Sequence, residues 1–148
     1  MKRTIAAIAS TLVLAGAGLI GSAPAAQAGA SCSFGCSQTY NDTGIGATAF
    51  RNWCWSGNTG DYSLTKPTCT SDGVKETFIG VGAHSTTPLN QDWDGFQVDA
   101  GWCYKIHFAI ALAPDWDWTY DASGGGAMWV KVANNAAAHI TSQTYGHC

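Results

Sequence analysis

The clearest pattern in the sequence is an alternation of large apolar and smaller or polar side chains over residues 101–112. One face of this segment carries Trp102, Tyr104, Ile106, Phe108 and Ile110, and the other carries Cys103, Lys105 and His107. Because successive side chains of a β-strand point to opposite faces, a period of two predicts a half-buried strand. Residues 115–120 repeat the pattern, with Trp116, Trp118 and Tyr120 on one face, and predict a second strand.

Other short segments are rich in β-branched and aromatic residues and are separated by turn residues, which is typical of strands. These segments are residues 44–55, 76–81, 95–98, 127–133 and 138–145. We expect loops at residues 62–70, around Pro67, and at residues 86–90, around Pro88. No long segment has helical periodicity with capping residues. The chain therefore predicts an all-β fold, a small antiparallel β-sandwich or barrel.

The N-terminal segment differs in character from the rest of the chain. Lys2 and Arg3 precede an apolar stretch that ends at Ala26-Gln27-Ala28. A basic start, an apolar centre and a small-residue cleavage site form a signal peptide. We expect residues 1–28 to be this leader and residues 29–148 to form a single secreted, extracellular domain without stable membrane insertion. A retained membrane anchor is the alternative, which the cleavage site disfavours. The Ala- and Gly-rich leader suits a GC-rich bacterial genome.

All the cysteines follow this leader: Cys32, Cys36, Cys54, Cys69, Cys103 and Cys148. An even number in an exported chain predicts three disulfides, although the pairing stays open. Cys54 and Cys69 bracket a loop that a bridge would close, and at least one bridge is expected to fix a chain end. A zinc site is the alternative, but paired C-x-x-C and H-x-x-x-H spacings are missing. We therefore expect no metal and no cofactor.

Charge restricts the class of partner. Charged residues make up 11% of the chain, and its formal net charge is −3. Nucleic-acid binding depends on clustered Lys and Arg, so we expect no nucleic-acid partner. The acidic balance also disfavours attraction to an anionic membrane. We expect a monomer whose partner is a glycan or an extracellular protein.

The aromatic content is high, with seven tryptophans. Trp102 and Trp129 are expected in the core because they lie in alternating strands. The expected exposed rings are Trp93, Trp116 and Trp118. Each lies beside aspartates, which normally need water; these are Asp92, Asp94, Asp115 and Asp117. Exposed aromatic rings offer a flat apolar face on which a sugar ring can stack.

These rings and aspartates lead to the first functional hypothesis. It is a secreted, non-catalytic binding protein whose exposed Trp and Asp residues bind an extracellular or cell-wall glycan. The alternative is a proteinaceous inhibitor of an extracellular protease or other hydrolase, acting through the 62–69 loop. This loop is extended by Pro67, tethered by Cys69, and offers Leu64 or Lys66 to a specificity pocket. A rigid loop loses little entropy on binding.

An enzyme is the third hypothesis, because catalytic motifs are weak. The motifs G-x-S-x-G and H-E-x-x-H are absent from the sequence. Two pairs, Asp92 with Asp94 and Asp115 with Asp117, suit the roughly 5–9 Å carboxylate spacing of a small glycan hydrolase. Residues 92–99 also resemble a fragment of a calcium loop, although they depart from the full pattern.

Overall fold

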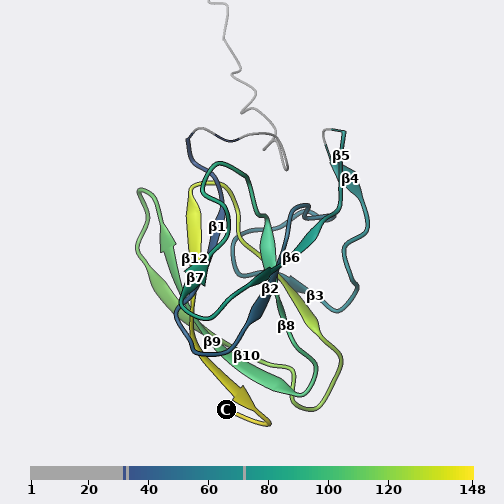
Figure 1. Ribbon diagram of the computed structural model, residues 1–148, viewed down its shortest axis with the longest axis vertical. Helices are drawn as coiled ribbons and strands as arrows, with labels where there is room; N and C mark the ends of the chain where they lie inside the picture. Colours follow the sequence, from purple (N-terminus) through teal and green to yellow (C-terminus); the bar gives the residue numbers. More distant parts are fainter. Residues whose placement is uncertain (1–31, 33, 72) are drawn as a thin grey trace, which may run out of the picture.

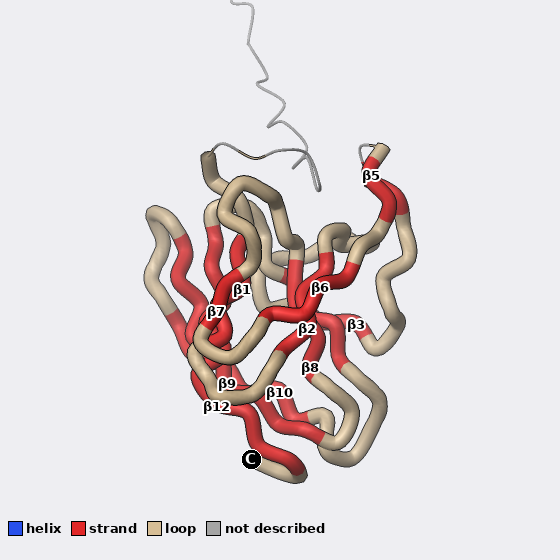
Figure 2. Tube along the Cα trace, viewed as in Figure 1, coloured by secondary structure: helices blue, strands red, loops and turns tan. Residues whose placement is uncertain are grey.

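The structure is a computed structural model that describes residues 32, 34–71 and 73–148 (Figure 1). The leader predicted over residues 1–28 lies outside the described residues. The described part of the chain consists of strands, turns and loops (Figure 2), so the expected all-β fold is confirmed. It contains no helix of the length and apolarity needed to span a membrane.

Two five-stranded sheets form the body of the domain. The first sheet has the order β10 (Trp116–Asp121), β9 (Trp102–Ile110), β12 (Ala136–Tyr145), β1 (Gln38–Asn41), β7 (Ser85–Thr86). The second has the order β3 (Tyr62–Ser63), β11 (Met128–Lys131), β8 (Gly95–Val98), β2 (Ala47–Phe50), β6 (Phe78–Val81). A separate hairpin of β4 (Thr70–Ser71) and β5 (Val74–Lys75) projects from the body. Both five-stranded sheets have open edges, so the arrangement is a sandwich and not a closed barrel.

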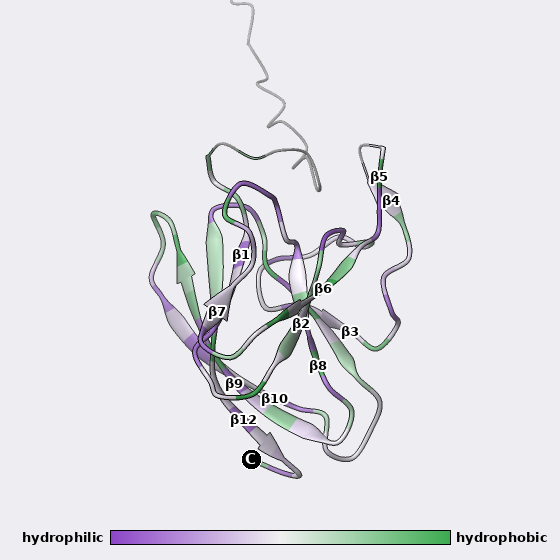
Figure 3. Ribbon diagram, viewed as in Figure 1, coloured by the Kyte–Doolittle hydropathy of each residue, from purple (hydrophilic) through white to green (hydrophobic). Residues whose placement is uncertain are grey.

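The hydrophobic core lies between the two sheets. Tyr104, Ile106 and Phe108 of β9 are buried against side chains of the second sheet, including Phe96 and Val130. The apolar face of β9 is therefore buried as predicted. On the opposite face Lys105 is exposed, His107 is half-buried and Cys103 is buried. Figure 3 shows the hydropathy of each residue along the ribbon. Burying each large apolar side chain contributes about 1.5–3 kcal/mol. Of the two predicted core tryptophans, Trp129 is buried, and Trp102 is partly buried against the core.

Strand β1 was not predicted, and it departs from the antiparallel pattern. It pairs in parallel with β12, with Gln38 opposite Ala137. Its buried residues include Thr39 and Asn41, so it has no apolar alternation to reveal it. Asn41 donates hydrogen bonds from Nδ2 to the carbonyl oxygens of Ile45, Val81 and Gly82. Since Val81 belongs to β6, this buried amide links the two sheets.

The predicted strand at residues 44–55 is shorter than expected, because β2 ends at Phe50. The amides of Arg51 and Asn52 donate to Oε1 of Glu76 at 3.0 and 3.2 Å. The amide of Trp53 donates to Oδ2 of Asp94 at 2.8 Å. Carboxylates thus take the place of a neighbouring strand, and residues 51–55 turn away from the sheet.

Three disulfides brace the sandwich, as predicted. They join Cys32 to Cys36, Cys54 to Cys69, and Cys103 to Cys148. The bridge from Cys148 fixes the C-terminal end of the chain to β9, and the bridge from Cys69 closes the loop that the sequence suggested.

Removing the Cys54–Cys69 bridge with the double substitution Cys54→Ser and Cys69→Ser should lower the free energy of unfolding by about 3 kcal/mol. The physical reason is that this bridge closes a loop with a sequence separation of 15. The matched pair Cys32→Ser and Cys36→Ser spans a separation of only 4, so its loss should be smaller, about 2 kcal/mol. Urea unfolding followed by tryptophan fluorescence measures both losses. A larger loss in the Cys32–Cys36 variant would contradict the loop-length explanation.

Candidate functional site

An aromatic cleft lies where the edges of the two sheets meet. We use this name for the depression whose aromatic lining residues are Trp53, Trp55, Tyr62, Trp116 and Trp118. Trp116 and Trp118 belong to β10, the edge strand of the first sheet, and Tyr62 belongs to β3, the edge strand of the second. The cleft has a volume of about 620 Å³, within the range of roughly 300–1,000 Å³ typical of small-molecule sites.

Four indoles line the cleft as two perpendicular pairs. The ring centroids of Trp53 and Trp55 are 4.9 Å apart with planes at 70°, and those of Trp116 and Trp118 are 6.0 Å apart at 76°. Trp116 packs on Phe108 with a centroid distance of 4.4 Å, so its support is the core itself. Trp118 is 56% exposed and Trp55 is 38% exposed. Each pair therefore combines a better-buried ring with one that faces solvent.

The loop at residues 56–61, which lines the same cleft, is held firmly against β10. The hydroxyl of Tyr120 donates to the carbonyl oxygen of Gly60 at 2.7 Å. Gly60 has a φ of 90°, and a Cβ there would lie 2.3 Å from Cη2 of Trp116. Only glycine tolerates both this backbone conformation and this close approach. The shape of the cleft is thus set before any ligand arrives.

Of the predicted exposed rings, Trp116 and Trp118 lie in the cleft but Trp93 does not. Trp93 is 2% exposed, so the prediction that it faces solvent is wrong. The aspartates beside it, Asp92 and Asp94, are buried as well. Asp92 accepts hydrogen bonds at Oδ1 from the amide and the hydroxyl of Ser37, at 2.7 and 2.5 Å. Protein donors replace water around these two carboxylates. The two aspartates in the sequence therefore did not indicate a surface segment.

Asp115 and Asp117 are exposed, but they point away from the aromatic cleft. Oδ1 of Asp117 lies 2.8 Å from Nδ1 of His107, and Oδ2 of Asp115 lies 3.8 Å from Nε2 of the same ring. Asp117 and His107 occupy the outer face of the sheet because side chains alternate along β10 and β9. The carboxylate that lines the cleft is Asp61, which was not among the site residues expected from the sequence.

Trp53, Trp55 and Tyr62 also line the cleft, although they were not among the site residues expected from the sequence. One signal was available: the Trp-x-Trp spacing of Trp53 and Trp55 repeats that of Trp116 and Trp118. Nothing in the sequence indicated that these two pairs would line the same depression.

The predicted inhibitory residues differ in their surroundings. Leu64 is 72% exposed. The ammonium of Lys66 instead lies 4.3 Å from the ring centroid of Phe78 and 5.9 Å from that of Trp129. The ammonium of Lys66 is therefore held by cation–π contacts, whereas Leu64 is a large apolar side chain that this loop presents to solvent.

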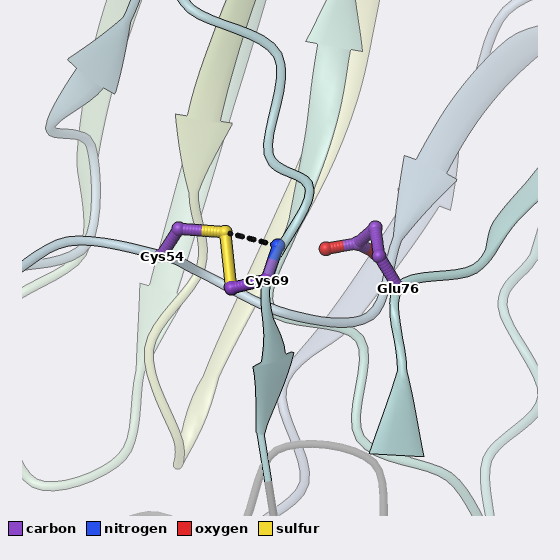
Figure 4. Close-up of side chains that lie close together, drawn as sticks. All are labelled: Cys54, Cys69 and Glu76. Atoms are coloured by element: carbon purple, nitrogen blue, oxygen red, sulfur yellow. Dashed lines mark hydrogen bonds between the residues drawn. A yellow bond between two sulfur atoms is a disulfide. The ribbon is translucent and has the colours of Figure 1, made fainter.

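A group of potential metal ligands occurs at Cys54, Cys69 and Glu76, whose ligand atoms all lie within 4.8 Å of one another (Figure 4). The two sulfur atoms are bonded to each other and therefore offer no thiolate. Oε1 of Glu76 accepts the amides of Arg51 and Asn52. These contacts make the group a structural support for the turn that follows β2.

Asp94 supports the end of the cleft that carries Trp53. Burial raises the pKa of Asp94 to about 7, and the nearby charge of Asp92 acts in the same direction. The hydrogen bond from the amide of Trp53 and the charge of Lys131 both oppose this rise in pKa. Nζ of Lys131 donates to the carbonyl oxygen of Gly57 at 2.6 Å and lies 6.0 Å from the ring centroid of Trp53. Asp94 and Lys131 thus hold the backbone of Trp53 and Gly57 in place beside the cleft.

No protein-family model, curated protein or solved structure matches this chain. The proposed function therefore rests on the chemistry of the aromatic cleft. Its rings offer flat apolar faces, and its hydroxyl, carboxylate and backbone groups offer hydrogen bonds. This combination suits a ligand with both apolar faces and hydroxyl groups.

The buried acid predicts a pH-dependent stability. Unfolded Asp94 releases its proton near its ordinary pKa of 3.8, and native Asp94 near pH 7. Between these values the native chain binds more protons than the unfolded chain, so the free energy of unfolding should fall as pH rises. Asp94→Asn, which stays neutral and keeps an acceptor for the Trp53 amide, should remove this part of the slope. Denaturation at a series of pH values measures it.

Asp61→Asn is the matched control, because it makes the same substitution at an exposed carboxylate that also accepts a backbone amide. A slope that is unchanged in Asp94→Asn would contradict the role assigned to Asp94.

Proposed function

We propose that this protein is a secreted, non-catalytic glycan-binding protein whose binding site is the aromatic cleft. The observation that carries the proposal is the convergence of two indole pairs and Tyr62 in one preformed depression. Large aromatic rings usually contribute most when buried, so Trp118, Trp55 and Tyr62 are costly to leave facing water. A cluster of such rings is typical of a binding surface.

Stacking on the C–H faces of a sugar explains this exposure. The aromatic face carries partial negative charge and the sugar C–H groups are weakly positive, which adds to the apolar contact. Asp61 accepts the amide of Asn58 at Oδ2, at 2.6 Å, and its carboxylate has further lone pairs for a sugar hydroxyl. Asp61 thereby takes the hydrogen-bonding role that we expected of Asp115 and Asp117.

The location belongs to the same proposal. Three disulfides indicate an oxidising setting. Together with the signal-peptide pattern of residues 1–28, they support secretion from a bacterial cell into a medium where glycans are available.

Trp118→Ala should weaken glycan binding about tenfold or more, since it removes the most exposed indole of the cleft. Calorimetric titration with soluble oligosaccharides measures the dissociation constant. The control is Tyr145→Ala, which removes a ring that is 77% exposed on β12 and does not line the cleft. Equal weakening by both substitutions, or no binding of any glycan by the unmodified protein, would refute the proposal.

Inhibition of an extracellular protease is a second candidate function, favoured by the exposure of Leu64. The loop that carries Leu64 is tethered by the Cys54–Cys69 bridge and by the contacts of Lys66 with Phe78. Such anchoring lowers the entropy lost when a loop enters a protease cleft.

Leu64→Gly should raise the inhibition constant for a protease that accepts leucine by about tenfold or more. Leu112→Gly is the matched control, because Leu112 is also an exposed leucine but lies in the β9–β10 connection. Residual protease activity at increasing protein concentration measures both. If the unmodified protein leaves such proteases fully active, this candidate is eliminated.

A further inference from the structure

We infer that the aromatic cleft binds a single, soluble, neutral glycan chain and does not bind the flat face of a crystalline polysaccharide. This inference rests on the proposed function and names the substrate class of the same site. Three features carry it: the angles between the rings, the position of the cleft between two sheets, and the charge of its lining.

The ring angles allow at most two of the four indoles to form part of a flat binding platform. A crystalline polysaccharide presents a plane, so several exposed rings must be coplanar to stack on it. The planes of Trp116 and Trp118 meet at 76°, and those of Trp53 and Trp55 meet at 70°. Only one ring of each pair can therefore lie parallel to any given plane. A single chain can instead stack on one ring of a pair while its edge contacts the other.

The position of the cleft between the two sheets favours a single chain over a flat solid surface. Its aromatic residues come from both sheets, because Trp116 and Trp118 lie on β10 whereas Trp53 and Trp55 follow β2. Tyr62 of β3 also lines the cleft, and its ring centroid lies 6.3 Å from that of the buried Tyr120. The rings thus border a depression of about 620 Å³ and do not form one raised surface.

The charge of the lining selects a neutral ligand. Asp61 is the charged residue among the lining residues of the cleft. The ammonium of Lys131 is held by the Gly57 carbonyl oxygen and lies outside this lining. A carboxylated or sulfated sugar would meet the Asp61 carboxylate, and none of the described residues that line the cleft carries a positive charge. Like charges in a partly desolvated cleft repel, most strongly at low ionic strength.

The test uses purified full-length mature protein with three sets of probes. The first is a set of neutral hexasaccharides: cellohexaose, xylohexaose, mannohexaose, laminarihexaose and chitohexaose. The second is an anionic oligogalacturonate of the same length. The third is crystalline cellulose and crystalline chitin. Calorimetry at low salt measures the soluble ligands, and depletion from the supernatant measures the solids.

At least one neutral hexasaccharide should bind, with the oligogalacturonate binding about tenfold or more weakly and the crystalline solids leaving the protein in solution. Trp55→Ala and Trp118→Ala should each weaken the neutral ligand about tenfold, since each removes the exposed ring of a different pair. Tyr145→Ala should bind as the unmodified protein does. Asp61→Asn should reduce the difference in dissociation constant between the neutral and the anionic hexasaccharides, because it removes the negative charge that repels the anion.

The remaining outcomes separate the inference from the function on which it rests. Binding to crystalline solids without binding to any hexasaccharide would overturn the single-chain inference and leave glycan binding intact. Preference for the oligogalacturonate would overturn the neutral-ligand inference and equally leave glycan binding intact. Failure to bind every probe would overturn the proposed function together with the inference.

Discussion

The packing of the apolar face of β9 between the two sheets is the contact on which the rest of the molecule depends. Tyr104, Ile106 and Phe108 are fully buried there, and β9 pairs with both β10 and β12. The same face supports the aromatic cleft, because the ring of Trp116 packs on Phe108 and Trp116 contacts Trp118. Packing in the core therefore fixes the orientation of Trp116, and through it that of the exposed Trp118. This explains how a small domain can hold a rigid aromatic cleft at its edge.

Two buried carboxylates and one that is partly buried perform a second structural task in this domain. These are Asp92, Asp94 and Glu76, which accept hydrogen bonds from backbone amides or a hydroxyl. The carboxylates thereby serve as acceptors in place of a neighbouring strand or water. Desolvation of a charged group is costly, which is why the pKa values of Asp94 and Glu76 are raised. Because these carboxylates bind the amides of residues 51–53, the chain turns away from the sheet after β2 and places Trp53 and Trp55 in the cleft.

Much of the framework was predictable from local patterns. The predicted segments contain strands β8, β9 and β11, and those for β10 and β12 match the observed strands to within two residues at each end. The short strand β1 was not, because its buried residues are polar and their partners are distant in the sequence. The site was predicted only in part. Trp116 and Trp118 were found from their alternation, but the burial of Trp93 depends on Ser37 donating to Asp92, which is a contact across 55 residues. Trp53 and Trp55 looked like part of a strand.

The sequence by itself determined the strand-rich character of the chain, the alternating faces of β9 and β10, and a cysteine framework suited to an oxidising setting. These properties follow from spacing and residue type, which act locally. Tertiary structure alone decided which cysteines pair, which aspartates are buried, and which tryptophans share a cleft. Those outcomes depend on the packing of one sheet against the other. This packing brings residues 53–62 beside residues 116–118, although strands β4 to β9 separate the two segments in the sequence.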